Sequence, residues 1–98
     1  MGIEVSRWDV SEHLKSEEDI AAYLNAVLEE DDPKLLQAAL GDIARARGMS
    51  GVAREVGVGR ESLYKSLSES GNPSFGTIVG VLRSMGLGIR VQPLAASS

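Results

Sequence analysis

The chain has 98 residues, of which 43% are hydrophobic and none is cysteine, and its formal net charge is −4 at pH 7. These values favour one globular domain with an aliphatic core, and they exclude a disulfide scaffold, a thiolate metal site and a cysteine nucleophile. No apolar run approaches the ~20 residues that span a bilayer, and the start does not resemble a signal peptide, so we expect a cytoplasmic protein without a membrane partner.

The charge is distributed unevenly along the chain. Residues 1–41 carry ten acidic and three basic side chains, a net charge of −7, whereas residues 42–98 carry four acidic and seven basic ones, a net charge of +3. An acidic first part and a basic second part indicate two different partners, although a solvated acidic helix face would give the same pattern.

Residues 1–32 are predicted to form an acidic N-terminal extension that contains helices. A short extra helix is expected over residues 9–15, with Trp8 before it as an anchor for core packing or for a protein partner. Ser16 is predicted to cap the next helix, over residues 17–30, in a capping box with Asp19, and the acids of the first turn suit the helix dipole. The apolar residues of that helix recur at helical spacing, at Ile20, Leu24, Val27 and Leu28.

Residues 33–86 are predicted to form the core of the domain. Asp32 and Pro33 are a typical N-cap and first residue of a helix, and Gly48 is expected to end that helix in a left-handed cap. The inner face of this helix is predicted to consist of Leu36, Ala39, Leu40 and Ile43.

Two very short helices are expected next, over residues 51–56 and 60–68, with Ser50 as the cap of the first. The small Ala53 suits the point where the second helix crosses the first, and Gly57 tolerates positive φ in the turn between them. The apolar residues that would hold both helices on the core are Val52, Val56, Val58, Leu63 and Leu67. This spacing favours a DNA-binding helix-turn-helix over an ordinary helical hairpin.

The second short helix has a polar outward face. Arg60 is expected to contact a base edge or a phosphate, and Lys65 a phosphate, whereas Glu61 and Lys65 could instead form an exposed ion pair. The full set of candidate DNA-binding residues is Ser50, Arg54, Arg60, Glu61, Ser62, Tyr64 and Lys65.

The C-terminal part is predicted to contain a helix and a strand. Ser74 caps a helix over residues 75–85, whose inward residues are expected to be Phe75, Ile78, Leu82 and Met85. Alternating apolar residues predict a strand over residues 87–92, followed by a flexible tail over residues 93–98. Because a lone strand leaves backbone groups unmatched, we expect a homodimer that pairs through Leu87, Ile89 and Val91.

No constellation of residues indicates an enzyme. His13 is the single histidine and has no second base or nucleophile beside it in the sequence. The acids at residues 29–32 lack the spacing of a calcium loop, and no phosphate-binding loop follows a glycine-rich turn. We therefore expect no catalytic residues, no metal and no cofactor.

Residues 48–67 (GMSGVAREVGVGRESLYKSL), followed by residues 71–75 (GNPSF), resemble the HigA-like addiction-module antidotes, the antitoxins of bacterial type II toxin–antitoxin operons. The likeness extends upstream through residues 21–24 and 40–48. The resemblance implies an all-α, lambda-repressor-like five-helix domain, to which the pattern above adds the short N-terminal helix and the C-terminal strand. It also implies a dimer that neutralises a small basic ribonuclease-type toxin and represses its own operon at double-stranded operator DNA.

Two positions depart from the pattern of these antidotes. Gly51 and Gly59 stand where relatives often have polar side chains, which predicts modest affinity for DNA. The alternative function is a solitary helix-turn-helix repressor, phage-like or an operon regulator, without a toxin partner. The acidic first part of the chain favours the antitoxin.

Overall fold

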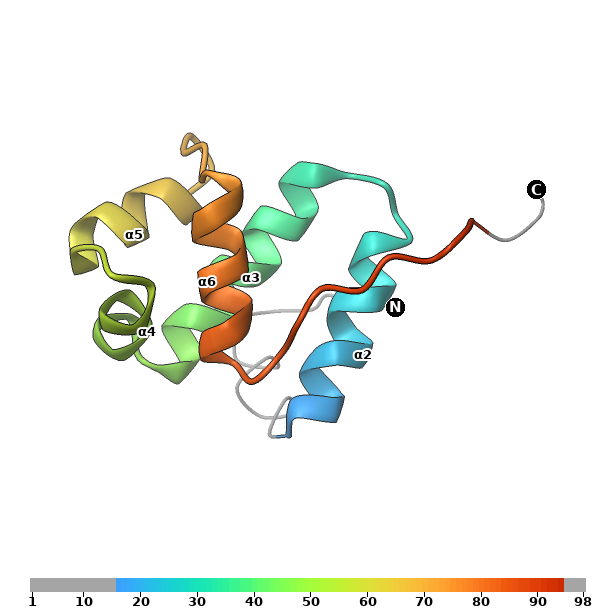
Figure 1. The fold of residues 1–98 in the computed structure, drawn as a ribbon. Helices are drawn as coiled ribbons and strands as arrows, with labels where there is room; N and C mark the ends of the chain where they lie inside the picture. The colour runs from blue at the N-terminus through green and yellow to red at the C-terminus, as the bar shows by residue number, and fades with distance from the viewer. Residues whose placement is uncertain (1–15, 95–98) are drawn as a thin grey trace.

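The computed structural model describes residues 16–94, which form five α-helices and no strand. The helices are α2 (Glu17–Leu28), α3 (Pro33–Arg47), α4 (Met49–Val56), α5 (Arg60–Leu67) and α6 (Phe75–Ser84). Figure 1 shows α2 at one end of the molecule, α4 and α5 at the other, and α3 and α6 between them. The prediction of an all-helical fold is confirmed for this part of the chain. The expected helix over residues 9–15 and Trp8 lie outside it.

Three helices begin where their caps were predicted. In each case a cap side chain accepts a hydrogen bond from a backbone N–H group of the first turn, which would otherwise lack a partner. The pairs are Ser16 with Asp19, Asp32 with Lys34, and Ser74 with Thr77, at 3.0–3.1 Å.

The prediction that Ser50 caps α4 is wrong. The helix begins two residues earlier than predicted, at Met49, and Gly48 serves as both the C-cap of α3 and the N-cap of α4. Gly48 has φ +106° and ψ +102°, so it does not adopt the expected left-handed helical conformation. With one residue shared between the two helices, no position remains for a serine cap.

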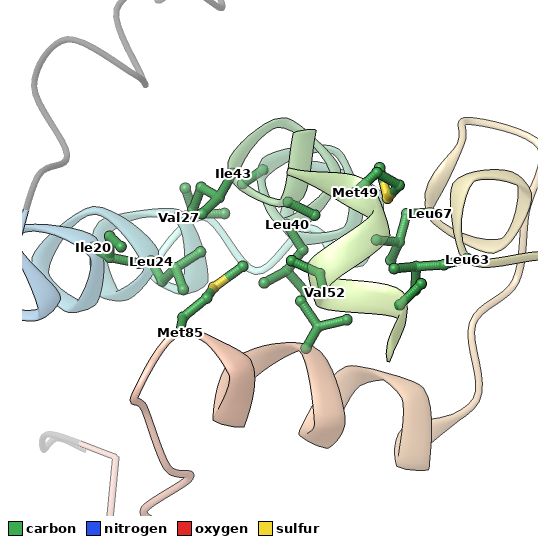
Figure 2. Packing of buried hydrophobic residues seen from close by; sticks show 14 residues of the cluster. Ile20, Leu24, Val27, Leu40, Ile43, Met49, Val52, Leu63, Leu67 and Met85 are labelled. Carbon is green, nitrogen blue, oxygen red and sulfur yellow. The ribbon is translucent and has the colours of Figure 1, made fainter. Parts of the chain in front are cut away.

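All five helices contribute to one aliphatic core. α3 packs against α2, α4 and α5, and α6 packs against α4. Figure 2 shows side chains from these helices converging, among them Ile20, Leu24, Val27, Leu40, Ile43, Met49, Val52, Leu63, Leu67 and Met85. α3 and α4 each touch three other helices, and α3 contacts both helices of the α4–α5 pair.

Two residues predicted to face the core are exposed instead. Leu28 is 54% exposed because it is the last residue of α2, beyond the buried stripe that ends at Val27. Phe75 is 72% exposed because residues 74–76 all lie at the solvent-exposed start of α6. α6 contacts the core through the buried Val81 and its C-cap Met85, and through the partly buried Ile78 and Leu82 as predicted. Sequence reasoning missed Val81.

The predicted strand over residues 87–92 does not form. Gly86 has φ +79°, and the N–H groups of Gly86 and Leu87 donate to the carbonyls of Arg83 and Leu82, which is the Schellman arrangement at a helix end. Leu87 packs partly on the core, so it closes α6 and does not start a strand. Residues 87–94, here named the C-terminal arm, have no strand to pair with in the described part of the chain.

None of the described helices is both long enough and apolar enough to cross a membrane.

Candidate nucleic-acid interface

The turn between α4 and α5 is short and closed by hydrogen bonds. Gly57 follows α4 in the left-handed conformation, with φ +90° and ψ +28°. The N–H groups of Gly57 and Val58 both donate to the carbonyl of Ala53, at 2.9 and 3.1 Å. A side chain at Gly57 would strain this conformation, which is why the turn needs glycine.

The inner faces of α4 and α5 are fixed by burial. Four of the predicted structural residues are no more than 5% exposed, namely Val52, Ala53, Leu63 and Leu67. Val58 differs from the expectation, since 39% of it is exposed and it supports the pair only weakly. Val56 is half-buried and lies against Gly80 of α6, where an added Cβ would come within 3.3 Å of the valine methyl groups.

The outer faces of α4 and α5 carry every candidate DNA-binding residue. All seven are exposed, and they are Ser50, Arg54, Arg60, Glu61, Ser62, Tyr64 and Lys65. Glu61 and Lys65, which both belong to the described chain, form no ion pair with each other, so the predicted alternative role for Glu61 is not seen. The charges of this face therefore remain available to a partner.

The start of α5 presents backbone N–H groups together with a cation. Gly59 is the N-cap, and it offers no side-chain hydrogen bond to the first turn. Arg60 is the first residue of the helix and is exposed. Because the N-terminal end of a helix has a partial positive charge, this end of α5 suits a phosphate group.

Sequence reasoning missed two residues of α3 that hold the segment after α5. The Gln37 side-chain amide donates to the carbonyls of Ser68 and Gly71, and the Lys34 ammonium donates to those of Glu69 and Gly71. Gln37 is only 8% exposed. A polar residue three positions before the core residue Leu40 was the available sequence signal, because it predicts a buried side chain that needs partners.

Sequence reasoning also missed Arg45 of α3. Its guanidinium carbon lies 5.9 Å from the centre of the Tyr64 ring, and its Nη2 lies 2.5 Å from a carboxylate oxygen of Asp42. No sequence signal connects positions 45 and 64, because the contact depends on how α3 and α5 cross. The outward face of α5 thus includes a side chain from the preceding long helix.

An open groove of about 880 Å³ separates α3 from the outer side of α5. Its lining includes Gln37, Arg45, Tyr64 and Leu67, together with both acidic and basic side chains. Within residues 16–94, no group of three or more His, Cys, Asp or Glu side chains could hold a metal ion. The arrangement offers polar and cationic contacts for binding.

The predicted dimerisation residues differ in exposure. Leu87 is half-buried, whereas Ile89 is 49% exposed and Val91 is 94% exposed. Leu94 at the end of the C-terminal arm is 93% exposed. The arm therefore presents apolar side chains to solvent, as a surface for a partner does.

Comparisons with known proteins cover nearly the whole chain. Residues 4–93 match the family described as "Probable addiction module antidote protein". An uncharacterized protein of Haemophilus influenzae (strain KW20/Rd) is 54% identical over 85 residues, which are 87% of this chain and 88% of that protein. No solved structure matches the chain.

Proposed function

The chain belongs to the family of probable addiction module antidote proteins, and from this we propose that it is the antitoxin of a type II toxin–antitoxin module of the HigA-like kind. In this role it binds and neutralises a small basic toxin, and it represses its own operon by binding double-stranded operator DNA. The role is one of binding in the cytoplasm, without catalysis and without a cofactor.

One observation carries the DNA-binding part of the proposal. α5 buries Leu63 and Leu67 at 1% and 2% exposure while Arg60, Tyr64 and Lys65 stay exposed, directly after the glycine turn. We assign the five helices α2 to α6 to the lambda-repressor-like fold, with α4 and α5 as the helix-turn-helix. In that fold the second helix of the pair lies in the major groove with its N-terminal end nearest the bases.

The position of the acidic residues supports a separate site for the toxin. The acids of α2 are exposed at its first turn and just beyond its last, at Glu17, Glu18, Asp19, Glu29 and Glu30. Figure 1 places α2 at the end of the molecule opposite α4 and α5. A basic toxin attracted to the acidic part of the chain would leave α5 free for DNA.

The C-terminal arm supports a homodimer. Its backbone has no strand partner in the described chain, and Ile89 and Val91 are exposed. Pairing of two arms would bury these side chains, and operator binding by such a dimer would require two copies of α5 about one DNA turn apart, roughly 34–36 Å. Light scattering should give a dimer for the full chain, and a monomer when residues 88–98 are deleted.

The function is tested by co-expression with the product of the neighbouring gene. We expect the full chain to capture a small basic protein and to relieve its growth inhibition, and also to retard a fragment of the promoter of the operon. The matched variant replaces Glu29 and Glu30 with glutamine, which should weaken toxin capture and leave promoter binding unchanged.

Toxin capture and promoter binding can fail separately, and each failure contradicts a different part of the proposed function. Promoter binding without capture of a basic protein would favour the solitary repressor over the antitoxin. Capture without promoter binding would remove the autoregulatory part of the proposal. Absence of both would contradict the proposed function altogether.

A further inference from the structure

Tyr64 occupies the middle of the outward face of α5. It is 51% exposed, and it stands four residues after Arg60 and next to Lys65. Its hydroxyl group makes no hydrogen bond to any described residue. A half-exposed tyrosine on a helix ordinarily exchanges between rotamers, and a partner that binds it must order it first.

The Tyr64 ring nevertheless has one contact within the protein, with Arg45 of α3. The Arg45 guanidinium lies over it at 5.9 Å, within the range of a cation–π contact. Arg45 is in turn oriented by Asp42, three residues earlier in α3, at 2.5 Å. These three side chains form a chain of contacts from α3 to the outer face of α5.

The backbone at this point is arranged for a close crossing of the two helices. Gly41 of α3 is buried, and a Cβ added there would come within 3.2 Å of the Leu67 carbonyl of α5 and 3.6 Å of an Arg45 guanidinium nitrogen. Because α3 carries no side chain at this position, α5 lies near enough for Arg45 to reach Tyr64. The contact is therefore a consequence of the helix packing.

We propose that Arg45 is a positioning residue for DNA binding, which holds the Tyr64 ring so that its free hydroxyl group meets a backbone phosphate of the operator. The inference rests on the proposed function, because it concerns the same face of α5. Asp42 partly neutralises Arg45, so Arg45 acts through Tyr64 and contributes little as a phosphate ligand of its own. Pre-ordering the ring lowers the entropic cost of binding.

The contact is tested first in the free protein. The Arg45 guanidinium carbon lies over the Tyr64 ring at 5.9 Å from its centre, so the ring should shift the nearest Arg45 NMR signals slightly upfield. The shift should disappear in Tyr64→Ala and persist in Tyr64→Phe, which retains the ring. Identical Arg45 signals in the wild type and in Tyr64→Ala would overturn the proposal without any measurement on DNA.

The second test measures binding to the protein's own promoter fragment at one fixed salt concentration. Arg45→Gln should weaken binding by about 3- to 10-fold, and Arg45→Lys by less, because an ammonium group can still lie over the ring. Tyr64→Phe should also weaken binding, since it removes only the hydroxyl. The control is Arg47→Gln, which removes one positive charge from the exposed last residue of α3.

Double variants separate positioning from simple loss of charge. Arg45→Gln should have little further effect in the Tyr64→Ala background, whereas Arg47→Gln should have its full effect there. If Arg45→Gln weakens DNA binding as much in the Tyr64→Ala background as in the wild type, as Arg47→Gln is expected to, the proposal is overturned. If the wild type binds no promoter DNA, the autoregulatory part of the proposed function fails together with the inference. That result is distinct from additive losses in a protein that does bind.

Discussion

The α4–α5 pair and the C-terminal arm have equally regular apolar patterns, but only the pair forms the structure that its pattern predicts. α4 and α5 complete their backbone hydrogen bonds within each helix and bury Val52, Leu63 and Leu67. The arm alternates apolar residues at Leu87 and Ile89, yet it forms no strand in residues 16–94. A helix satisfies its own backbone, whereas a strand needs a second strand beside it.

The outer face of α5 and the C-terminal arm are also different kinds of binding surface. The outer face of α5 lies on a helix whose inner face is fixed by the core and whose end is held by Gln37. The arm has Val91 at 94% exposure and no such support. We therefore expect α5 to act as a rigid binding element, and the arm to become ordered only against a partner.

Substitutions in the α4–α5 pair and in the C-terminal arm should differ most in their effect on the free energy of unfolding. Leu63→Ala removes a side chain that is 1% exposed, so it should lower the free energy of unfolding by about 2–5 kcal/mol. Leu94→Ala in the arm, at 93% exposure, should change it by less than about 0.5 kcal/mol. Urea denaturation of both variants gives the comparison, and similar losses would contradict the division into a fixed pair and an unsupported arm.

The next largest effects concern the binding of DNA by α5. Arg60→Ala should cost about 1–3 kcal/mol on the operator and reduce discrimination against random DNA, because Arg60 stands at the N-terminal end of the helix. Lys65→Ala should weaken binding to both DNAs similarly and make the salt slope shallower by about one unit. Binding isotherms over a salt series distinguish the two, and equal behaviour of the two variants would refute the assigned roles.

A smaller effect should follow from removing the support behind α5. Gln37→Ala leaves the carbonyls of Ser68 and Gly71 without the amide donor, which should cost about 1–2 kcal/mol because water can partly replace it in this loop. Gln37→Glu keeps the shape but places a carboxylate against the same carbonyls, so it should be more destabilising. Thermal unfolding ranks the three proteins, and a glutamate variant as stable as the wild type would exclude the amide contact.

The sequence was sufficient where a local rule decides the structure, as the caps Ser16, Asp32 and Ser74 and the turn at Gly57 illustrate. It was insufficient where the result depends on how elements meet. The inner face of α6 was predicted only in part, because Val81 was missed and because Phe75 does not reach the core at the exposed start of the helix. The contact between Arg45 and Tyr64 depends on the crossing of α3 and α5.

The smallest predicted effect is a pH dependence at Tyr23, outside both regions. Burial, with a smaller contribution from the Asp42 carboxylate, raises the pKa of Tyr23 above its usual value. The neutral phenol is thus favoured by folding, so its contribution to stability is present below about pH 10 and is lost as the pH rises through the raised pKa. Tyr23→Phe should unfold with a weaker pH dependence above about pH 10, and Asp42→Asn should lower the pKa seen in a tyrosinate absorbance titration. A Tyr23 that titrates at its ordinary pKa in the folded protein would contradict this.

The central claim is that DNA binds to the outer face of the α4–α5 pair, and NMR mapping of the binding surface tests it most directly. Titrating the isotopically labelled full chain with its own promoter fragment should give the largest shift changes at the amides of Ser50 and of residues 59–65. Amides of α2 should change little, because Figure 1 places this helix at the far end of the molecule. Largest changes in α2 or the C-terminal arm, or no changes at all, would contradict the account.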